Sequence, residues 1–173
     1  METMRKGKKE KNMSLAFRKA KREDTELVLS FIRGIAEYEK LSGEVIATRE
    51  VLERSLFDEH RAEVLFALED GKEVAFALFF HNFSTFVGRA GLYLEDLFVL
   101  LEYRGRGIGK ALLEELAQIA VERNCGRMEW VCLDWNSPSI AFYRSLGAEP
   151  MDEWTLWRLS GDTLLKFGSG KKK

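Results

Sequence analysis

The sequence contains few cysteines, histidines and prolines and no long apolar run, and each of these absences excludes a class of protein. It has two cysteines, two histidines and two prolines in 173 residues, and its longest wholly apolar run, residues 74–80, has seven residues. No transmembrane helix is expected, because one needs about 20 apolar residues. Cys125 and Cys132 do not form a C-x-x-C pair, and the two histidines lie far apart in the sequence. We therefore predict no disulfide framework, no zinc site and no metal cofactor.

The sequence also lacks a large net charge, but the charge that it has is unevenly distributed. The formal net charge is −1, yet the first 13 residues hold five lysines or arginines against two glutamates, and the last three residues are lysines. The body between these ends is therefore acidic, so it attracts cations and repels nucleic acid. We interpret the basic ends as solvated tails, with a nucleic-acid or membrane tether as the alternative. The N-terminus lacks the apolar segment of a secretory signal, so we expect a cytoplasmic protein with no nucleic-acid or membrane partner.

Length and composition predict one globular domain. A domain commonly spans about 100 to 200 residues. The hydrophobic fraction of 46% and the charged fraction of 32% are ordinary for folded proteins. No repeat or internal low-complexity linker divides the chain. We expect a basic, disordered tail at residues 1–13, a single domain at residues 14–167 and a second basic tail at residues 168–173.

The hydrophobic pattern predicts strands alternating with helices. Apolar residues at three-and-four spacing indicate amphipathic helices, and the Asp-Gly pair in the turn of residues 69–72 indicates a hairpin. The predicted strands are residues 14–18, 62–68, 73–80, 90–100, 127–133 and 154–159. The predicted helices run from Asp24 through Ala36, from Thr48 through Leu56, from Ile108 to a stop at Gly126, and from Asn136 or Ser137 to Gly147. This order predicts an α/β (α+β) fold in which helices flank a mixed, mostly antiparallel central sheet.

The most specific segment is residues 97–113, where an apolar strand runs into glycines that open a helix. Unpaired backbone N–H groups at such a helix start, at the positive end of the helix dipole, suit a phosphate or pyrophosphate. The P-loop pattern fails, because Arg104 and Ala111 stand where it requires Gly and Ser or Thr. The Rossmann pattern also fails, because Lys110 and Leu112 stand where it requires its third glycine.

The pattern that fits is Arg-x-x-Gly-x-Gly, formed by Arg104, Gly107 and Gly109. In this motif the sequence resembles the GCN5-related N-acetyltransferase (GNAT) superfamily. The alternative is that the glycines serve only a tight turn. The resemblance implies a splayed strand pair that forms a cleft for acetyl-CoA, with the pyrophosphate on this turn. The residues that it implies in acetyl-CoA binding are Leu97, Phe98, Val99, Arg104, Gly105, Arg106, Gly107, Ile108, Gly109, Lys110, Asn136 and Ser139.

Further segments carry a narrower resemblance. They are residues 92–99, residues 37–42, residues 133–136 and the pair Phe142-Tyr143. Together they are similar to the spermidine/spermine (diamine) acetyltransferase family and its thialysine acetyltransferase branch, over about residues 15–165. This resemblance implies a homodimer.

The same resemblance implies roles for four side chains. Glu95 serves the amine, Tyr143 protonates the leaving thiolate, and Tyr38 and Glu39 contact the amine. A further glutamate that contacts substrate in that family, just before the last strand, has no match at the same spacing, and Glu153 is the nearest acidic residue.

The residues can also be interpreted without the family. Strand alternation places Glu95 and Asp96 on opposite faces, the first with Tyr93, Leu97 and Val99, the second with Leu94, Phe98 and Leu100. A carboxylate in an apolar strand must be paired, hydrated or functional. We assign Glu95 to the active site, with a structural ion pair as the alternative. For Asp96 we favour a structural ion pair, with a role in the active site as the alternative. For Tyr143, the alternative to a role in the active site is a packing position in the core.

These observations predict an enzyme. We expect an acetyl-CoA-dependent N-acetyltransferase that transfers acetyl to a primary amine of a small cationic acceptor, either a polyamine or diamine or a lysine- or thialysine-like amino acid. Such an amine has a pKa of about 10.4 and must lose a proton before it attacks directly in a ternary complex. One alternative acceptor is a protein N-terminus or lysine. An alternative of another class is a non-catalytic acyl-CoA-binding regulatory module.

Overall fold

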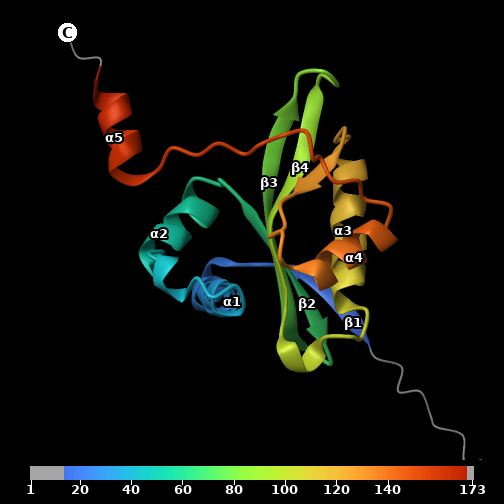
Figure 1. Ribbon diagram of the computed structural model, residues 1–173. Coiled ribbons are helices and arrows are strands. Elements are labelled where there is room, and N and C mark those ends of the chain that lie inside the picture. Colours follow the sequence, from blue (N-terminus) through green and yellow to red (C-terminus); the bar gives the residue numbers. More distant parts are fainter. Residues whose placement is uncertain (1–13, 171–173) are drawn as a thin grey trace, which may run out of the picture. The chain divides into compact units, whose positions relative to one another are not determined.

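The computed structural model describes residues 14–170, in two compact units that divide after Val131 (Figure 1). The predicted tails at residues 1–13 and 171–173 lie outside the described residues. The first unit contains strands β1 (Leu15–Lys19), β2 (Glu63–Glu69), β3 (Lys72–Ser84), β4 (Arg89–Val99) and β5 (Met128–Trp130), and helices α1 (Thr25–Tyr38), α2 (Arg49–Glu53) and α3 (Ile108–Glu122). The second unit contains helices α4 (Ser137–Ser145) and α5 (Gly161–Ser169).

The sheet of the first unit is mixed, as the sequence predicts. Its strand order is β1-β2-β3-β4-β5, with antiparallel pairing from β1 to β4 and parallel pairing between β4 and β5. The turn between β2 and β3 contains Asp70 with φ 51° and Gly71 with φ 81°, which confirms the hairpin signal of the Asp-Gly pair. The strand predicted at residues 127–133 is shorter than expected, because only Met128–Trp130 pair with β4.

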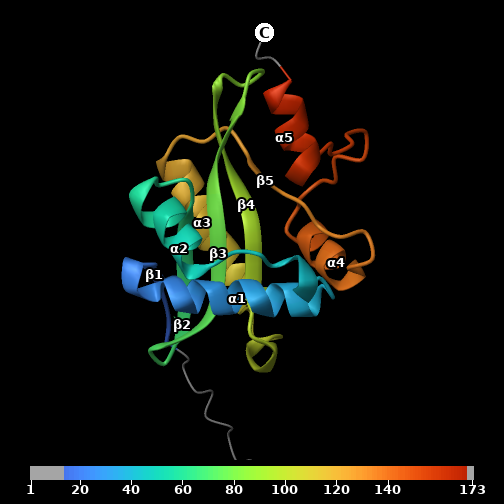
Figure 2. The same ribbon diagram turned by 90° about the vertical axis from the view of Figure 1, so that its left-hand side faces the viewer.

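Helices α1 and α3 cover opposite faces of this sheet (Figures 1 and 2). On the α1 face, the ring of Phe31 stacks on that of Phe76 in β3, with centroids 5.0 Å apart, within a core that also includes Val28, Leu56, Val64, Phe66 and Phe98. On the other face, Leu112 and Leu116 of α3 are fully buried. None of the helices among residues 14–170 is long and apolar enough to cross a membrane.

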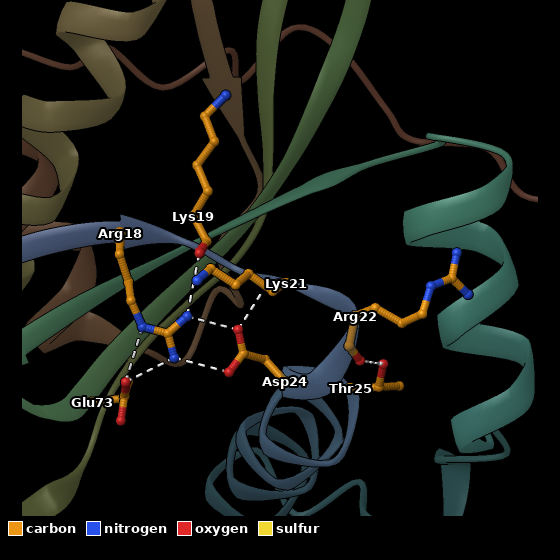
Figure 3. Close-up of polar contacts among 7 residues, drawn as sticks. All are labelled: Arg18, Lys19, Lys21, Arg22, Asp24, Thr25 and Glu73. Atoms are coloured by element: carbon orange, nitrogen blue, oxygen red, sulfur yellow. Dashed lines mark hydrogen bonds and ion pairs between the residues drawn. The ribbon is translucent and has the colours of Figure 1, made fainter.

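Arg18 joins three elements of the first unit (Figure 3). Its guanidinium donates to both oxygens of Asp24, at 2.6 and 2.9 Å, and to Glu73 Oε1 of β3. The carboxylate of Asp24 also accepts the N–H of Lys21 at 2.7 Å. Asp24 therefore stands directly before α1, as predicted, but its carboxylate binds β1 and the preceding turn and does not cap the N–H groups of α1.

Two predicted helix ends are corrected by the structure. Thr48 begins the second helix, and its Oγ1 accepts the N–H of Val51, but the α-helix ends at Glu53 and continues as a π-helical turn over Arg54–Asp58. The third helix does not run to a stop at Gly126. It ends at Glu122, and Asn124 takes the left-handed conformation, with φ 55°, because asparagine tolerates that region better than most residues.

The second unit differs most from the prediction. Helix α4 forms as expected, and Gly147 follows it with φ 85°. The strand predicted at residues 154–159 is wrong, because this segment pairs with no strand among residues 14–170 and an isolated strand leaves its backbone groups unpaired. Helix α5 was not predicted, since its apolar run is short and glycines bound it.

Candidate active site

Strand β4 contains a bulge at Glu95. Asp96 pairs with Leu78 of β3, but Leu94 pairs with the next residue, Phe79, so Glu95 is the extra residue of β4. The predicted alternation therefore breaks at Glu95: Asp96 shares a face with Phe98, as predicted, but with Tyr93 and not with Leu94. Tyr93 and Asp96 lie opposite Phe80 and Leu78, and all four point to the face covered by α1.

The bulge decides which carboxylate is buried. Glu95 is exposed, whereas Asp96 is half-buried. Burial raises the pKa of Asp96 to about 6, and the charges of Glu95 and Glu39 contribute to the rise. No ion pair of Asp96 is present within residues 14–170, so the predicted role of Asp96 as an ion-pair partner is not met. Asp96 is a carboxyl group that can gain and lose a proton near neutral pH.

Helix α1 delivers the other predicted amine-contacting residues to the same place. Tyr38 is the last residue of α1 and Glu39 follows it. Burial raises the pKa of Glu39, and its charge acts on Asp96. Glu39, Glu95 and Asp96 therefore form one acidic group, contributed by the end of α1 and the bulge of β4. Such a group can hold a cationic ligand.

The end of β4 lies open on one side. Strand β5 pairs with β4 only from Leu92 to Leu94, and β4 continues to Val99. Among residues 14–170, the stretch of β4 after Leu94 has no strand partner on the β5 side. Strand β4 thus extends past the end of β5, as the splayed strand pair implied by the family resemblance requires, and the splay itself stays a prediction.

The glycine turn after β4 has the backbone that its sequence requires. Gly105 and Gly107 have φ values of 74° and 79°, in the left-handed region that favours glycine. Gly107 occupies the N-cap position of α3 and no side chain caps that end, so the first N–H groups of the helix are available to an anion.

Glycine at position 109 bears on whether this turn fits a large phosphate ligand. It lies within the first turn of α3, where alanine would be more stable by about 1 kcal/mol. A Cβ at Gly109 would lie 3.6 Å from Val99 Cγ2, which is an ordinary contact, so packing inside the protein does not demand glycine. At Gly107, the N-cap of α3, a Cβ would meet nothing within 4 Å, so there is open space at the start of the helix. The turn therefore fits the pyrophosphate of acetyl-CoA.

Three basic side chains of the predicted cofactor set have partners within the protein. Arg104 donates its Nε–H to the carbonyl of Val99 at 3.0 Å, and its guanidinium lies 4.3 Å from the ring centroid of Tyr38. Arg106 pairs with Glu69, and Lys110 pairs with Glu114. The structure thus brings the predicted cofactor and amine residues together through Arg104 and Tyr38.

Helix α4 of the second unit carries the remaining predicted residues. Asn136 is buried at the N-cap of α4, and its Oδ1 accepts the N–H of Ser139 at 3.4 Å. Pro138 fits this first turn because its missing N–H needs no partner there. Tyr143 lies on the same helix, with its ring 5.5 Å from that of Phe142.

The comparison with protein families decides the class. The family model described as "Acetyltransferase (GNAT) family" matches residues 23–148. The chain belongs to the GNAT family. It is an N-acetyltransferase, and members of this family use acetyl-CoA as cosubstrate.

Individual relatives agree with this family. The chain is 35% identical over 163 residues to a thialysine N-epsilon-acetyltransferase of Sus scrofa, covering 87% of this chain and 95% of that protein. It is 44% identical over 97 residues to an L-ornithine N5-acetyltransferase of Arabidopsis thaliana, covering 56% of this chain and 42% of that protein. Among solved structures, an integron cassette protein from the mobile metagenome of V. cholerae superposes with a TM-score of 0.76 at 30% identity, covering 91% of this chain and 99% of the other.

The sequence gives no indication of two features of this GNAT site. One is the bulge, since a bulge depends on how β4 pairs with β3. The other is the buried Glu69, which stands at the end of β2 and pairs with Arg106 in the glycine turn. Its only sequence signal is a carboxylate at the end of an apolar strand, and that pattern is common.

Proposed function

We propose that this acetyltransferase acts on a primary amine of a small cationic acceptor, either a polyamine or diamine or a basic amino acid of the lysine type. The observation that carries this proposal is the acidic group of Glu39, Glu95 and Asp96, connected to the glycine turn through the contact of Tyr38 with Arg104. A cationic acceptor gains from these charges while its amine approaches the end of β4. The names of the relatives include two basic amino acids, thialysine and ornithine, which supports an acceptor of this kind.

The acidic group also supplies a route for the proton. An alkylammonium must become an amine before it can act as a nucleophile. We propose that Glu95 binds the ammonium and accepts its proton, directly or through one water. Asp96, with its pKa raised to about 6, is positioned to share that proton. Tyr38 and Glu39 orient the acceptor at the end of α1.

The remaining residues hold the cofactor and complete the transfer. Acetyl-CoA supplies a thioester whose carbonyl carbon is the electrophile. We propose that the N–H groups of residues 105–110 bind its pyrophosphate, that Asn136 and Ser139 also contact it, and that a backbone N–H among residues 97–99 stabilises the oxyanion. Tyr143 donates a proton to the departing thiolate, which has a pKa near 8.5. The amine attacks directly, and no covalent intermediate forms on the protein.

Calorimetry with acetyl-CoA tests the cofactor site. Gly107→Asp places a side chain and a negative charge at the proposed pyrophosphate position, and we expect at least about a 10-fold loss of affinity. Gly88→Asp is the matched control, because Gly88 also has positive φ and open space around it but lies in the β3–β4 turn. Equal affinity of the Gly107→Asp variant and the wild-type protein would overturn this site.

A panel of acceptors tests the reaction. CoA release is measured with diamines, spermidine, ornithine, lysine, thialysine and peptides that offer an N-terminus or a lysine. We expect turnover with the small amines. Turnover with the peptides alone would support protein acetylation, and tight acetyl-CoA binding without release for any acceptor would support a regulatory module.

We also propose that the chain forms a homodimer. Several large apolar side chains of the second unit are exposed in the single chain, among them Trp154, Trp157 and Phe167 at 73%, 89% and 76%. Exposed apolar surface of this kind marks a protein interface, and a second copy is the partner that the family resemblance implies. Light scattering should give about twice the mass of 19.9 kDa, and a single-chain mass at micromolar concentration would contradict the proposal. The cytoplasmic location and the lack of metal, membrane and nucleic-acid partners stay predictions of the sequence.

A further inference from the structure

Glu69 is a buried carboxylate that the proposed chemistry does not use. It is the last residue of β2, and its side chain is only 9% exposed. Its Oε2 accepts a hydrogen bond from Arg106 Nη1 at 3.0 Å. Its Oε1 is buried and has no hydrogen-bond partner within residues 14–170. Burying a charged group costs free energy unless it is well paired, so this position needs an explanation.

Arg106 stands in the middle of the glycine turn. It lies between Gly105 and Gly107, the two residues in the left-handed conformation. Its second terminal nitrogen, Nη2, donates to the carbonyl of Glu102 at 2.9 Å, and its guanidinium lies 5.0 Å from the ring centroid of Tyr103. The side chain of Arg106 thus connects Glu69 to the backbone at the start of the turn.

The β2–β3 hairpin makes a second contact with the same turn. Lys72, the first residue of β3, lies 5.4 Å from the ring centroid of Tyr103, and its Nζ is 3.5 Å from the tyrosine hydroxyl. Both ends of the hairpin turn therefore contact residues 102–106, Glu69 through Arg106 and Lys72 through Tyr103. Glycine has more backbone freedom than any other residue, so a turn that contains Gly105 and Gly107 needs such contacts to hold one conformation.

We propose that Glu69 is a positioning residue for acetyl-CoA. Through Arg106 it fixes the glycine turn in the conformation that presents its N–H groups to the pyrophosphate. The conformational entropy of the turn is then lost during folding and not during binding, which strengthens binding without any contact between Glu69 and the ligand. The inference rests on the proposed acetyl-CoA site. It gives Arg106 a role different from direct phosphate contact, since its guanidinium is directed to Glu69 and Glu102.

The proposal predicts a specific pattern in three variants. Glu69→Gln, Arg106→Met and the double variant should each raise the acetyl-CoA KM and Kd by about 10-fold, the effect of a lost charge-assisted hydrogen bond. The double variant should bind no more weakly than Arg106→Met, because Glu69 acts on the turn through Arg106. The kcat and the KM of the amine should stay within about twofold of wild type. A loss of structure alone would not separate the two KM values in this way.

Glu73→Gln is the matched control. Glu73 lies in the same hairpin, and its carboxylate pairs with Arg18 away from the glycine turn. This variant should lose stability and keep the acetyl-CoA KM. Circular dichroism and thermal unfolding check that every variant is folded. If Glu69→Gln does not fold, Arg106→Met provides the test, because the side chain of Arg106 is 43% exposed and its replacement disturbs the core less.

Arg106→Lys separates positioning from direct phosphate contact. Lysine keeps the positive charge but cannot bridge Glu69 and the Glu102 carbonyl as the guanidinium does. We expect Arg106→Lys to bind acetyl-CoA as weakly as Arg106→Met. Wild-type affinity of Arg106→Lys, or tighter binding by Glu69→Gln, would mean that Arg106 serves the phosphate and would overturn the proposal. If the wild-type protein itself does not bind acetyl-CoA, both the proposed function and this inference are wrong.

Discussion

The guanidinium of Arg104 lies 4.3 Å from the ring centroid of Tyr38 while its Nε–H bonds to the carbonyl of Val99. One side chain therefore joins the end of α1, the end of β4 and the start of the glycine turn. A second ring, that of Phe98, lies 5.2 Å from the same guanidinium. Because these elements carry the proposed amine and cofactor residues, a change at Arg104 affects both parts of the site.

Arg104→Met is expected to lower the free energy of unfolding by about 1 to 3 kcal/mol, from the lost hydrogen bond and cation–π contacts. The KM values of acetyl-CoA and of the amine should both rise, in contrast to the Glu69 variants. Denaturant titration and steady-state kinetics measure these effects. Arg54→Met is the control, since Arg54 forms a surface ion pair with Glu59 at 3.8 Å, and such pairs contribute little. An unchanged amine KM in Arg104→Met would show that the contact with Tyr38 does not connect the two sites.

Asp96 should give the protein a distinctive dependence on pH. The pKa of Asp96 in the folded protein is about 6, above the ordinary value of 3.8. Protonated Asp96 therefore contributes its full share to the stability of the fold below pH 3.8, and this contribution is lost as the pH rises through about 6. Asp96→Asn should therefore be more stable than wild type above pH 6, on the order of 1 to 3 kcal/mol, and equally stable near pH 3.5. Thermal unfolding across this range measures the difference.

Glu95→Gln provides a check on the cause. The charge of Glu95 contributes to the raised pKa of Asp96, so its removal should move this pH window downward. A stability difference between Asp96→Asn and wild type that does not vary with pH would show that burial has not raised the pKa of Asp96.

Tyr143→Phe should lower kcat by about 10² to 10⁴, the typical cost of a lost general acid, with little change in acetyl-CoA affinity. Ser145→Ala is the control on the same helix, because the Ser145 hydroxyl donates a hydrogen bond to the Phe142 carbonyl of its own helix. A pre-steady-state measurement is needed, since product release can mask a change in the chemical step. If the chemical step of Tyr143→Phe keeps its wild-type rate, Tyr143 is a packing residue.

Asp24 should show the opposite dependence on pH to Asp96. Its hydrogen bonds with Arg18 lower its pKa below 3.8, so its contribution to stability is present above pH 3.8 and is lost as the pH falls further (Figure 3). Asp24→Asn should lower the free energy of unfolding at pH 7 by about 1 to 3 kcal/mol. The difference from wild type should shrink below pH 3.8. A cost that is the same at pH 7 and pH 3 would speak against the ion pair.

The sequence by itself determined the features that depend on neighbouring residues. Apolar spacing predicted helices α1 and α3, and the Asp70-Gly71 pair predicted the β2–β3 turn. The start at Asn136 or Ser137 and the stop at Gly147 predicted α4. The Arg-x-x-Gly-x-Gly pattern likewise located the glycine turn, because positive φ and unpaired N–H groups follow from glycine and from a helix start. These features involve only a few consecutive residues, so local physical chemistry is enough to predict them.

Only the tertiary structure decided which carboxylate is buried and which segments are strands. The bulge that exposes Glu95 and half-buries Asp96 depends on the register of β4 against β3, and a one-residue shift in register reverses the direction of every later side chain. Residues 154–159 have the composition of a strand but pair with no strand in the part of the chain that the structure describes. Glu69 and Arg106 meet across 37 residues of sequence. Pairing between distant segments is a property of the whole fold, so no local pattern contains it.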